Sequence, residues 1–483
     1  SRHRRRAASR SDIPMHRLPR TLPRGALATL LLAEALLARA DDAGTPTEDE
    51  PVVDAVSLVQ PALLSGPGFG VDSHVELRGY MAHFMLDTPV GPLNADSVEI
   101  LAEREAELPA IDAIEKVTRS DAFVKAAGAK FVATGAALAK VVLHPVDTVL
   151  GIPAGVARYF GNRIRKVAAQ AQAASDRVAR ELGTSGNPYP PDEGPMTDAR
   201  GGDGDGARKR RKHWYSSVTS EAERELKRQL KYNDVKRTLA RDLGIDPYTG
   251  NPYVQQRLSE LAWVGTGGTF SATSALGAVG GVGATVLSNG GRINDVVWKL
   301  SPDDLRARNN ERLRAYCRDE LLTRQFLRRG VFSPTLQTGL VDALDRLRPS
   351  GGGDALLELG MTAHSELESR FLVNALRMTA AYLGDRAHGG LLRPIGAGLA
   401  YEAADHELVL PLPVDWLSWT IEVRDFLDRA EFRVANKTAL IGGGASLAAR
   451  RALTERGWNI VMRTPWPGAP PYAAFDEPAP PSD

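Results

Sequence analysis

The feature that most constrains the fold of this chain is a run of 31 positions, 261–291, without a charged side chain. Nine of these positions are glycine and seven are serine or threonine, so the run offers little apolar area for its length. Each glycine lowers helix propensity by about 1 kcal/mol relative to alanine. Small residues spaced four apart nevertheless allow helix backbones to pack closely, and two such rows occur here: Gly267–Ser271–Ala275 and Gly277–Gly281–Thr285.

Three interpretations of this run remain open. A buried helical hairpin in a soluble core explains the absence of charge, because full burial excludes charged groups. A membrane-inserting segment explains the length and the rows of small residues. A flexible loop that covers a ligand explains the glycine content. The candidate contact residues for a membrane or partner helix are Trp263, Phe270, Gly277 and Gly281.

A second stretch rich in small residues, 122–142, contains Gly135 at the centre of a similar row. We add Gly135 to the candidate contact residues because the two stretches could pack against each other. Lys125, Lys130 and Lys140 argue against a helix that spans a lipid bilayer, since each ammonium group would have to reach the interface or find a partner.

The N-terminal region predicts export. Residues 15–40 combine arginines, a short apolar stretch and an Ala-Arg-Ala end, which is the three-part pattern of a secretory signal peptide. We interpret residues 1–14 as upstream or added sequence. The predicted location is therefore the periplasm or the cell envelope of a bacterium. An Ala/Leu helix that begins the fold is the structural alternative.

Charge and cysteine content exclude several classes of protein. Residues 1–40 carry nine arginines against Asp12 and Glu34, a net charge of +7, so the remaining 443 residues carry −6. That sign disfavours nucleic acid as a partner, because binding to DNA needs a surplus of Lys and Arg. The single cysteine, Cys317, excludes an internal disulfide, and its helical, mostly apolar surroundings predict a buried thiol.

Composition and periodicity predict an α+β, predominantly α-helical fold with close-packed Gly/Ala-rich helices. The N-terminal part contributes a small β element, and the C-terminal part contributes a β-hairpin followed by a βαβ-like cap. After the leader, the predicted segments are an acidic, flexible spacer (41–67), the small β element with a helical region (68–182), a disordered Gly/Pro linker with a basic run (183–212), a helical region (213–395), the hairpin and cap (396–464), and a disordered Pro-rich tail (465–483).

The densest group of ionisable residues near predicted strands is Asp405, His406 and Glu407, with Asp415 nearby. These are the candidates for a hydrolase site, although a polar hairpin tip explains these residues without chemistry and is the favoured interpretation. His364 and Glu368 have a spacing that suits a metal on a helix, but no third ligand is evident, so an ion pair on the helix surface is the favoured interpretation. The glycines at 442–444 lack the complete dinucleotide fingerprint, and Ser446 is predicted to cap a helix.

We recognise no characterised family in these motifs, and whether the chain is an enzyme stays open. The favoured hypothesis is an exported scaffold or interaction protein that contacts a membrane surface or partner helices, without cofactor, metal or nucleic acid. The alternatives are a periplasmic hydrolase that uses Asp405, His406, Glu407 or His364, and a secreted toxin or pore-former. The sequence does not identify a small-molecule ligand.

Overall fold

Helices and strands both contribute to the fold, which confirms the α+β class. The structure is a computed structural model that describes residues 45–127, 155–161, 220–266, 270–278 and 291–474. Residues 47–483 form one compact unit, and all contacts described below lie within it. The predicted signal peptide, the Gly/Pro linker and its basic run fall outside the described residues.

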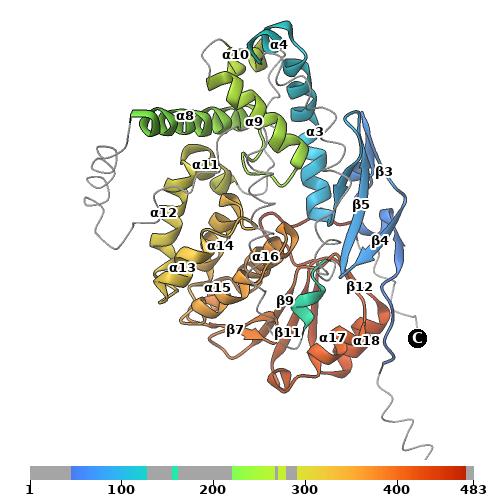
Figure 1. The fold of residues 1–483 in the computed structure, drawn as a ribbon. Coiled ribbons are helices and arrows are strands. Elements are labelled where there is room, and N and C mark those ends of the chain that lie inside the picture. Colours follow the sequence, from blue (N-terminus) through green and yellow to red (C-terminus); the bar gives the residue numbers. More distant parts are fainter. Residues whose placement is uncertain (1–44, 128–154, 162–219, 267–269, 279–290, 475–483) are drawn as a thin grey trace, which may run out of the picture. The chain divides into compact units, whose positions relative to one another are not determined.

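An antiparallel sheet forms the N-terminal part (Figure 1). Its strands pair in the order β1-β4-β5-β3-β2, and β6 pairs with β5. In β4 buried and exposed residues alternate strictly, as expected for a strand with one solvated face. The strands are β1 (Val52–Asp54), β2 (Ser65–Gly66), β3 (Phe69–Val71), β4 (His74–Arg78), β5 (Met81–Asp87) and β6 (Leu93–Ala95); the short helices α2 (Ala55–Leu58) and η1 (Pro61–Leu63) lie between β1 and β2.

The helix that follows, α3 (Val98–Thr118), connects this sheet to the helical region. Ser97 caps its N-terminus by accepting a hydrogen bond from the backbone of Ile100. Pro109 lies inside this helix and does not divide it. Its buried side chains include charged residues as well as aliphatic ones, and α4 (Asp121–Ala127) follows directly.

The central region is helical. Helices α8 (Ser220–Leu243) and α9 (Pro252–Thr266) pack against each other, as expected for an αα-hairpin. The remaining helices of this region are α10 (Ala272–Ala278), α11 (Gly291–Lys299), α12 (Pro302–Leu313), α13 (Glu320–Phe326), α14 (Pro334–Leu347), α15 (Gly353–Met361) and α16 (Glu366–Leu383). Cys317 is buried as predicted, and burial raises the pKa of its thiol to about 12.

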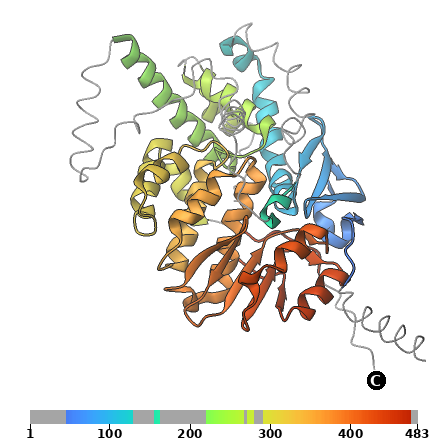
Figure 2. The ribbon, with the colours of Figure 1, turned by 60° about the horizontal axis from the view of Figure 1, so that its bottom comes forward.

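The C-terminal region is a five-stranded mixed sheet in the order β13-β11-β9-β8-β7. The hairpin strands β7 and β8, and β8 and β9, are antiparallel, whereas β9, β11 and β13 run parallel. Figure 2 shows helices on both faces of this sheet, with α15 and α16 against β7 and β9 and with α18 against β13. The elements are β7 (Leu391–Ile395), β8 (Gly398–Glu402), β9 (Leu408–Leu412), β10 (Trp416–Leu417), α17 (Ile421–Leu427), β11 (Lys437–Ile441), β12 (Gly444–Ala445), α18 (Leu447–Glu455) and β13 (Asn459–Met462).

Three segment predictions differ from the structure. The predicted spacer contains β1, α2, η1 and β2, because its apolar residues join the N-terminal sheet. The predicted tail packs as far as residue 474, with Trp466 buried and Tyr472 bridged to Val59. The predicted helical region ends before residue 395, because β7 forms an edge of the C-terminal sheet. Composition alone could not reveal these distant partners.

Candidate functional site

Asp405, His406 and Glu407 lie at the turn between β8 and β9, and they differ in burial and in hydrogen-bond partners. Glu407 is buried and accepts hydrogen bonds from Tyr382 (2.9 Å), Thr438 (2.6 Å) and Arg386 (2.8 Å). Arg386 also donates to Asp405 at 3.1 Å. These contacts fasten the turn to α16 and to the following 3₁₀ turn, so the carboxylate of Glu407 is fully engaged in holding the hairpin.

His406 has a mostly solvent-exposed side chain and a left-handed backbone, with φ of 63°. Its Nδ1 lies 3.3 Å from Glu402 Oε1. A histidine in this conformation at a hairpin tip is typical of a turn residue. The structure thus brings Asp405 and Glu407 together through Arg386, whereas His406 lies against Glu402.

The predicted ion pair on a helix surface is wrong, because His364 precedes α16 and Glu368 is buried. Glu368 is only 1% exposed and pairs with Arg158, with 2.6 Å between Nε and Oε1. The backbone N–H of His364 donates to the other carboxylate oxygen of Glu368 at 2.7 Å. Glu368 therefore joins the start of α16 to the segment 155–161, a role that depends on the distant Arg158. Burial, together with Arg158 and Arg329, lowers the pKa of His364 to about 4.

The candidate contact residues divide into two groups. Phe270 is buried against Phe123 of α4, with ring centroids 5.6 Å apart, and Trp263 is partly buried. Phe270 is therefore part of the internal packing. Gly277 is exposed on α10, and an added Cβ would meet nothing within 4 Å. Gly281 and Gly135 lie outside the described residues. No helix in the described ranges is both long enough and apolar enough to span a bilayer.

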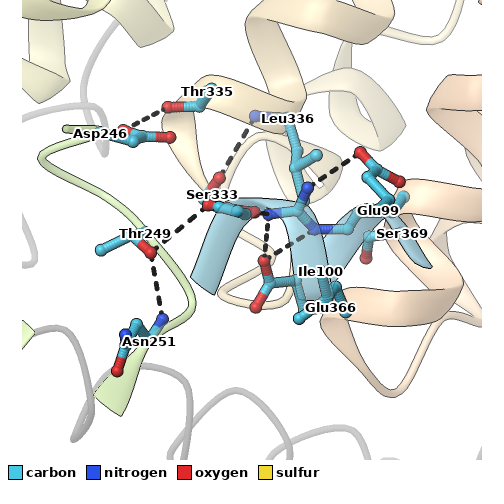
Figure 3. A network of polar contacts seen from close by, with 12 residues as sticks. Glu99, Ile100, Asp246, Thr249, Asn251, Ser333, Thr335, Leu336, Glu366 and Ser369 are labelled. Carbon is cyan, nitrogen blue, oxygen red and sulfur yellow. Dashed lines mark hydrogen bonds and ion pairs between the residues drawn. The ribbon is translucent and has the colours of Figure 1, made fainter. Parts of the chain in front are cut away.

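A partly buried polar network joins α3, α16 and the loop between α8 and α9, and the sequence did not predict it (Figure 3). Its centre is Arg370, whose guanidinium donates to Glu99 (2.9 Å) and Glu103 (2.5 Å) of α3 and to Glu366 (2.8 Å) of its own helix. Asn374 donates to the second oxygen of Glu99 at 2.6 Å. Burial opposes ionisation of Glu366, but Arg370 outweighs it, and the pKa of this carboxyl is lowered.

One helical turn further along α3, Glu107 extends the network to the loop before α9. Its carboxylate accepts hydrogen bonds from Thr249 and from the amide of Asn251 (2.7 Å), and Arg104 lies at 3.3 Å. Burial raises the pKa of Glu107 to about 7, although Arg104 acts in the opposite direction. We call Glu99, Glu103 and Glu107 the acidic row of α3.

The loop itself is fitted closely to this network. A Cβ on Gly250 would lie 1.5 Å from a carboxylate oxygen of Glu366, so only glycine fits there without a shift. Asp246 accepts a hydrogen bond from Thr335 at 2.8 Å, and burial raises its pKa to about 6. Figure 3 shows Asp246, Thr249 and Asn251 along one loop that faces Glu99 and Glu366.

The contact between α3 and α9 continues beyond the acidic row. Glu115 of α3 accepts a hydrogen bond from the hydroxyl of Tyr253, and Arg257 lies 3.2 Å from the same carboxylate oxygen. Between α8 and α9, Lys236 donates to Gln255 (2.7 Å) and Ser259 (3.2 Å), and burial lowers its pKa to about 7. A neutral amine beside a hydroxyl resembles a nucleophile–base pair. Ser259 is completely buried, however, so these contacts serve helix packing.

Asp415, the fourth ionisable residue near the strand ends, holds three segments together. It is 1% exposed, and one carboxylate oxygen accepts the backbone N–H groups of Ala82 (3.0 Å) and Val98 (3.1 Å). The other oxygen accepts the hydroxyl of Tyr472 at 2.8 Å. Burial raises its pKa to about 6. Asp415 thus ties β5, the start of α3 and the C-terminal segment to the carboxyl end of β9.

The carboxylates described above are thus engaged by hydrogen bonds and ion pairs that join separate elements of the fold. Within the described ranges, no group of three or more His, Cys, Asp or Glu side chains is placed to hold a metal ion. The spacing of the acidic row, i, i+4 and i+8, was visible in the sequence but is also the spacing of a solvated helix face. No family model, curated protein or solved structure matches this chain.

Proposed function

We propose that the protein is an exported, non-catalytic scaffold that contacts a membrane surface or partner helices through its two stretches rich in small residues. The proposal rests on one contact, the packing of Phe123 of α4 against Phe270 before α10. This contact joins the described part of one stretch, 122–127, to the described part of the other, 270–278.

The contacts of Glu115 on α3 support the proposal by explaining how this arrangement is held. Tyr253 and Arg257 fix α9 to Glu115 near the end of α3, and α4 begins three residues after α3 ends. Helix α10 also packs against α3, α8 and α9. These contacts are therefore suited to hold α4 and α10 rigid before a partner binds. A rigid surface loses less conformational entropy on binding.

The residues that continue the two stretches suit close packing. Residues 128–142 and 279–287 include Gly135 and Gly281 and are dominated by alanine, glycine and small polar residues. Such surfaces bring helix backbones into contact, which compensates for their small apolar area. The exposed Gly277 on α10 continues the same row as Gly281, and we assign it to the contact surface.

Fractionation of expressing cells tests this proposal. We expect the wild-type protein to remain with carbonate-washed membranes, and we expect Gly277→Leu to reduce that fraction several-fold by blocking close approach. Leucine also raises helix propensity by about 0.8 kcal/mol, so the variant should not unfold. Gly70→Leu is the matched control, because a Cβ there also meets nothing within 4 Å. Complete recovery of the wild type in the soluble periplasm would contradict membrane contact.

Cross-linking in the same cells tests the contact with partner helices. A photoreactive residue at position 277 should give a discrete adduct with one protein, and the same probe at position 70 should give none. Equal, diffuse labelling from both positions would mean that the surface of α10 has no special role.

A further inference from the structure

The loop between α8 and α9, residues 244–251, contains a hydroxyl group that two carboxyl groups of α3 share. Thr249 Oγ1 donates to Oε1 of Glu107 and lies 3.4 Å from Oε1 of Glu103. A threonine hydroxyl has one proton to donate and two lone pairs that accept. Thr249 can therefore satisfy only one of these two oxygens while both carboxyl groups are ionised.

A proton on Glu107 removes this shortage of donors. The protonated oxygen Oε1 donates to Thr249, and Thr249 is then free to donate to Glu103. The other oxygen of Glu107 accepts the amide of Asn251 at 2.7 Å and lies 3.3 Å from Arg104. The side chain of Glu107 is completely buried, so bulk water does not reach it. The protonated form of Glu107 therefore makes the more complete set of hydrogen bonds.

Asp246, nearer the start of the same loop, also has an oxygen suited to a proton. It accepts hydrogen bonds from the N–H of Tyr248 and from the hydroxyl of Thr335, both at 2.8 Å. Both of these bonds end on Oδ1. Oδ2 is therefore the oxygen that can carry a proton without displacing either donor.

Burial and a neighbouring carboxylate both favour the neutral forms of these two groups. Burial raises the pKa of Glu107 to about 7 and that of Asp246 to about 6. Glu103 faces both groups and repels negative charge on either. The cations that oppose this effect are Arg104, beside Glu107, and Arg370, which acts on Asp246 from α16.

We propose that this loop is a proton-sensitive latch: it holds the α8–α9 hairpin on α3 while Glu107 and Asp246 carry protons, and it loosens when they ionise. Helix α9 begins directly after the loop and packs on α3, so the change reaches the start of α9. The latched form binds these protons more tightly than an open loop does. Protonation therefore stabilises the latch most below about pH 4, and this stabilisation is lost as pH rises through 6 to 7. The inference is independent of the contacts with a membrane or with partner helices.

Two further groups face Asp246 but act outside this pH range. Burial lowers the pKa of Lys236 to about 7, so the contribution of this amine to stability grows only as pH rises above that value. Burial raises the pKa of the Tyr248 phenol, which therefore stays protonated. Measurements up to about pH 7 accordingly report on the two carboxyl groups.

Amide hydrogen exchange in the full chain, read by mass spectrometry, tests the latch. The N–H groups of Thr249 and Gln255 report on the loop, because they donate to the carbonyls of Asp246 (3.2 Å) and Asn251 (2.9 Å). Their protection factors, corrected for the intrinsic effect of pH on exchange, should fall about tenfold or more between about pH 5 and pH 7. Amides of α18 serve as the reference and should change less. Wild-type loop protection that stays constant over this range overturns the latch.

The neutral variant Glu107→Gln/Asp246→Asn should keep the loop protected throughout this pH range. Glutamine at position 107 supplies an N–H to Thr249 and a carbonyl to Asn251, and asparagine at position 246 keeps Oδ1 as an acceptor. Asp242→Asn is the matched control, because this exposed carboxylate lies on the last turn of α8 and outside the loop contact. The control should show the same fall in protection as the wild type.

Circular dichroism shows whether each variant is folded. A folded double variant whose loop protection falls as much as that of the wild type overturns the latch. If the double variant does not fold, Asp246→Asn alone replaces it, because this single change keeps both accepted hydrogen bonds. Loop protection in Asp246→Asn should fall less than in the wild type, and an equal fall contradicts the proposal.

Discussion

Helix α3 is held in place through two kinds of carboxylate, the fully buried Asp415 at its N-terminus and its own partly buried Glu99 and Glu103, and their donors differ. At its N-terminus, Asp415 is satisfied by two backbone N–H groups and one tyrosine hydroxyl. Along its length, Glu99 and Glu103 are satisfied mainly by a single guanidinium, that of Arg370. Backbone donors are fixed by the fold, whereas a guanidinium must be ordered together with its long side chain.

This difference in donors indicates which substitutions should destabilise the Asp415 site and which should destabilise the Arg370 network. Loss of one partner at Asp415 leaves two others in place. Loss of Arg370 leaves three partly buried carboxylates, Glu99, Glu103 and Glu366, without their shared cation, and an unpaired charge is costly where water reaches it poorly. The stability of the network should therefore depend mainly on Arg370. Removing the partners of Asp415 one at a time should lower stability in smaller increments.

The largest expected effect is that of Arg370→Met. Methionine retains most of the volume but removes the charge, so we expect the free energy of unfolding to fall by about 3–5 kcal/mol. Denaturation by urea measures the change. The control is Arg424→Met, whose partner Asp425 is half exposed, and we expect it to cost less than about 1 kcal/mol. Equal losses of unfolding free energy for both variants would show that Arg370 contributes no more than an exposed ion pair.

Asp415→Ala should have the next largest effect. It leaves the N–H groups of Ala82 and Val98 without their acceptor, at about 1–3 kcal/mol for each buried group. Asp415→Asn should cost less, because its carbonyl oxygen still accepts. If Asp415→Ala proves more damaging than Arg370→Met, fixed backbone donors are not the more tolerant arrangement.

The pH dependence of stability sharpens the comparison. Burial raises the pKa values of Asp415 and Asp246 to about 6 and that of Glu107 to about 7, so the folded state binds these protons more tightly than the unfolded state. Their contribution to the free energy of unfolding is therefore largest below about pH 4 and is lost as pH rises through 6 to 7.

We accordingly expect the urea midpoint of the wild type to vary between pH 4 and pH 7. The three carboxyl groups lower the midpoint as pH rises, whereas His364 raises it. The pKa of His364 is lowered to about 4 by burial and by Arg158 and Arg329, so its contribution is lost as pH falls from about 6.5 towards 4. The test is the difference in unfolding free energy between Asp415→Asn and the wild type, measured as a function of pH. Asp415→Asn should gain relative to the wild type as pH rises from 4 to 7, and a constant difference would contradict the raised pKa of Asp415.

The smallest expected effect is that of Tyr472→Phe. This change removes one donor from Asp415 and leaves both backbone donors, so we expect a loss of about 1 kcal/mol. Thr249→Val is the corresponding change beside Glu107, where fewer fixed donors remain. A cost for Thr249→Val well below that for Tyr472→Phe would reverse the proposed order of the two sites.

Local patterns in the sequence predicted local structure. The small β element expected in segment 68–182 includes β4, and Ser446 caps α18 as expected. The turn at Asp405–Glu407 was also expected. These features depend on residues within a few positions of one another, where propensity and periodicity carry most of the information.

Contacts between distant residues could not be predicted in the same way. Glu99 and Arg370 are 271 positions apart, and nothing in either segment indicates the other. The partners of Asp415 and Glu50 are backbone N–H groups, which every residue except proline possesses and which therefore leave no signal in the sequence. Gly250 was the one local hint, since its lack of a side chain admits Glu366.

The length of α3 has a mechanical consequence. Its 21 residues span about 30 Å, and the helix is gripped at its first residue by Asp415 and near its last turn by Tyr253 through Glu115. A helix held at both ends by hydrogen bonds transmits force along its axis. A force applied at α4 would accordingly be transmitted along α3 to the carboxyl end of β9, the central strand of the C-terminal sheet.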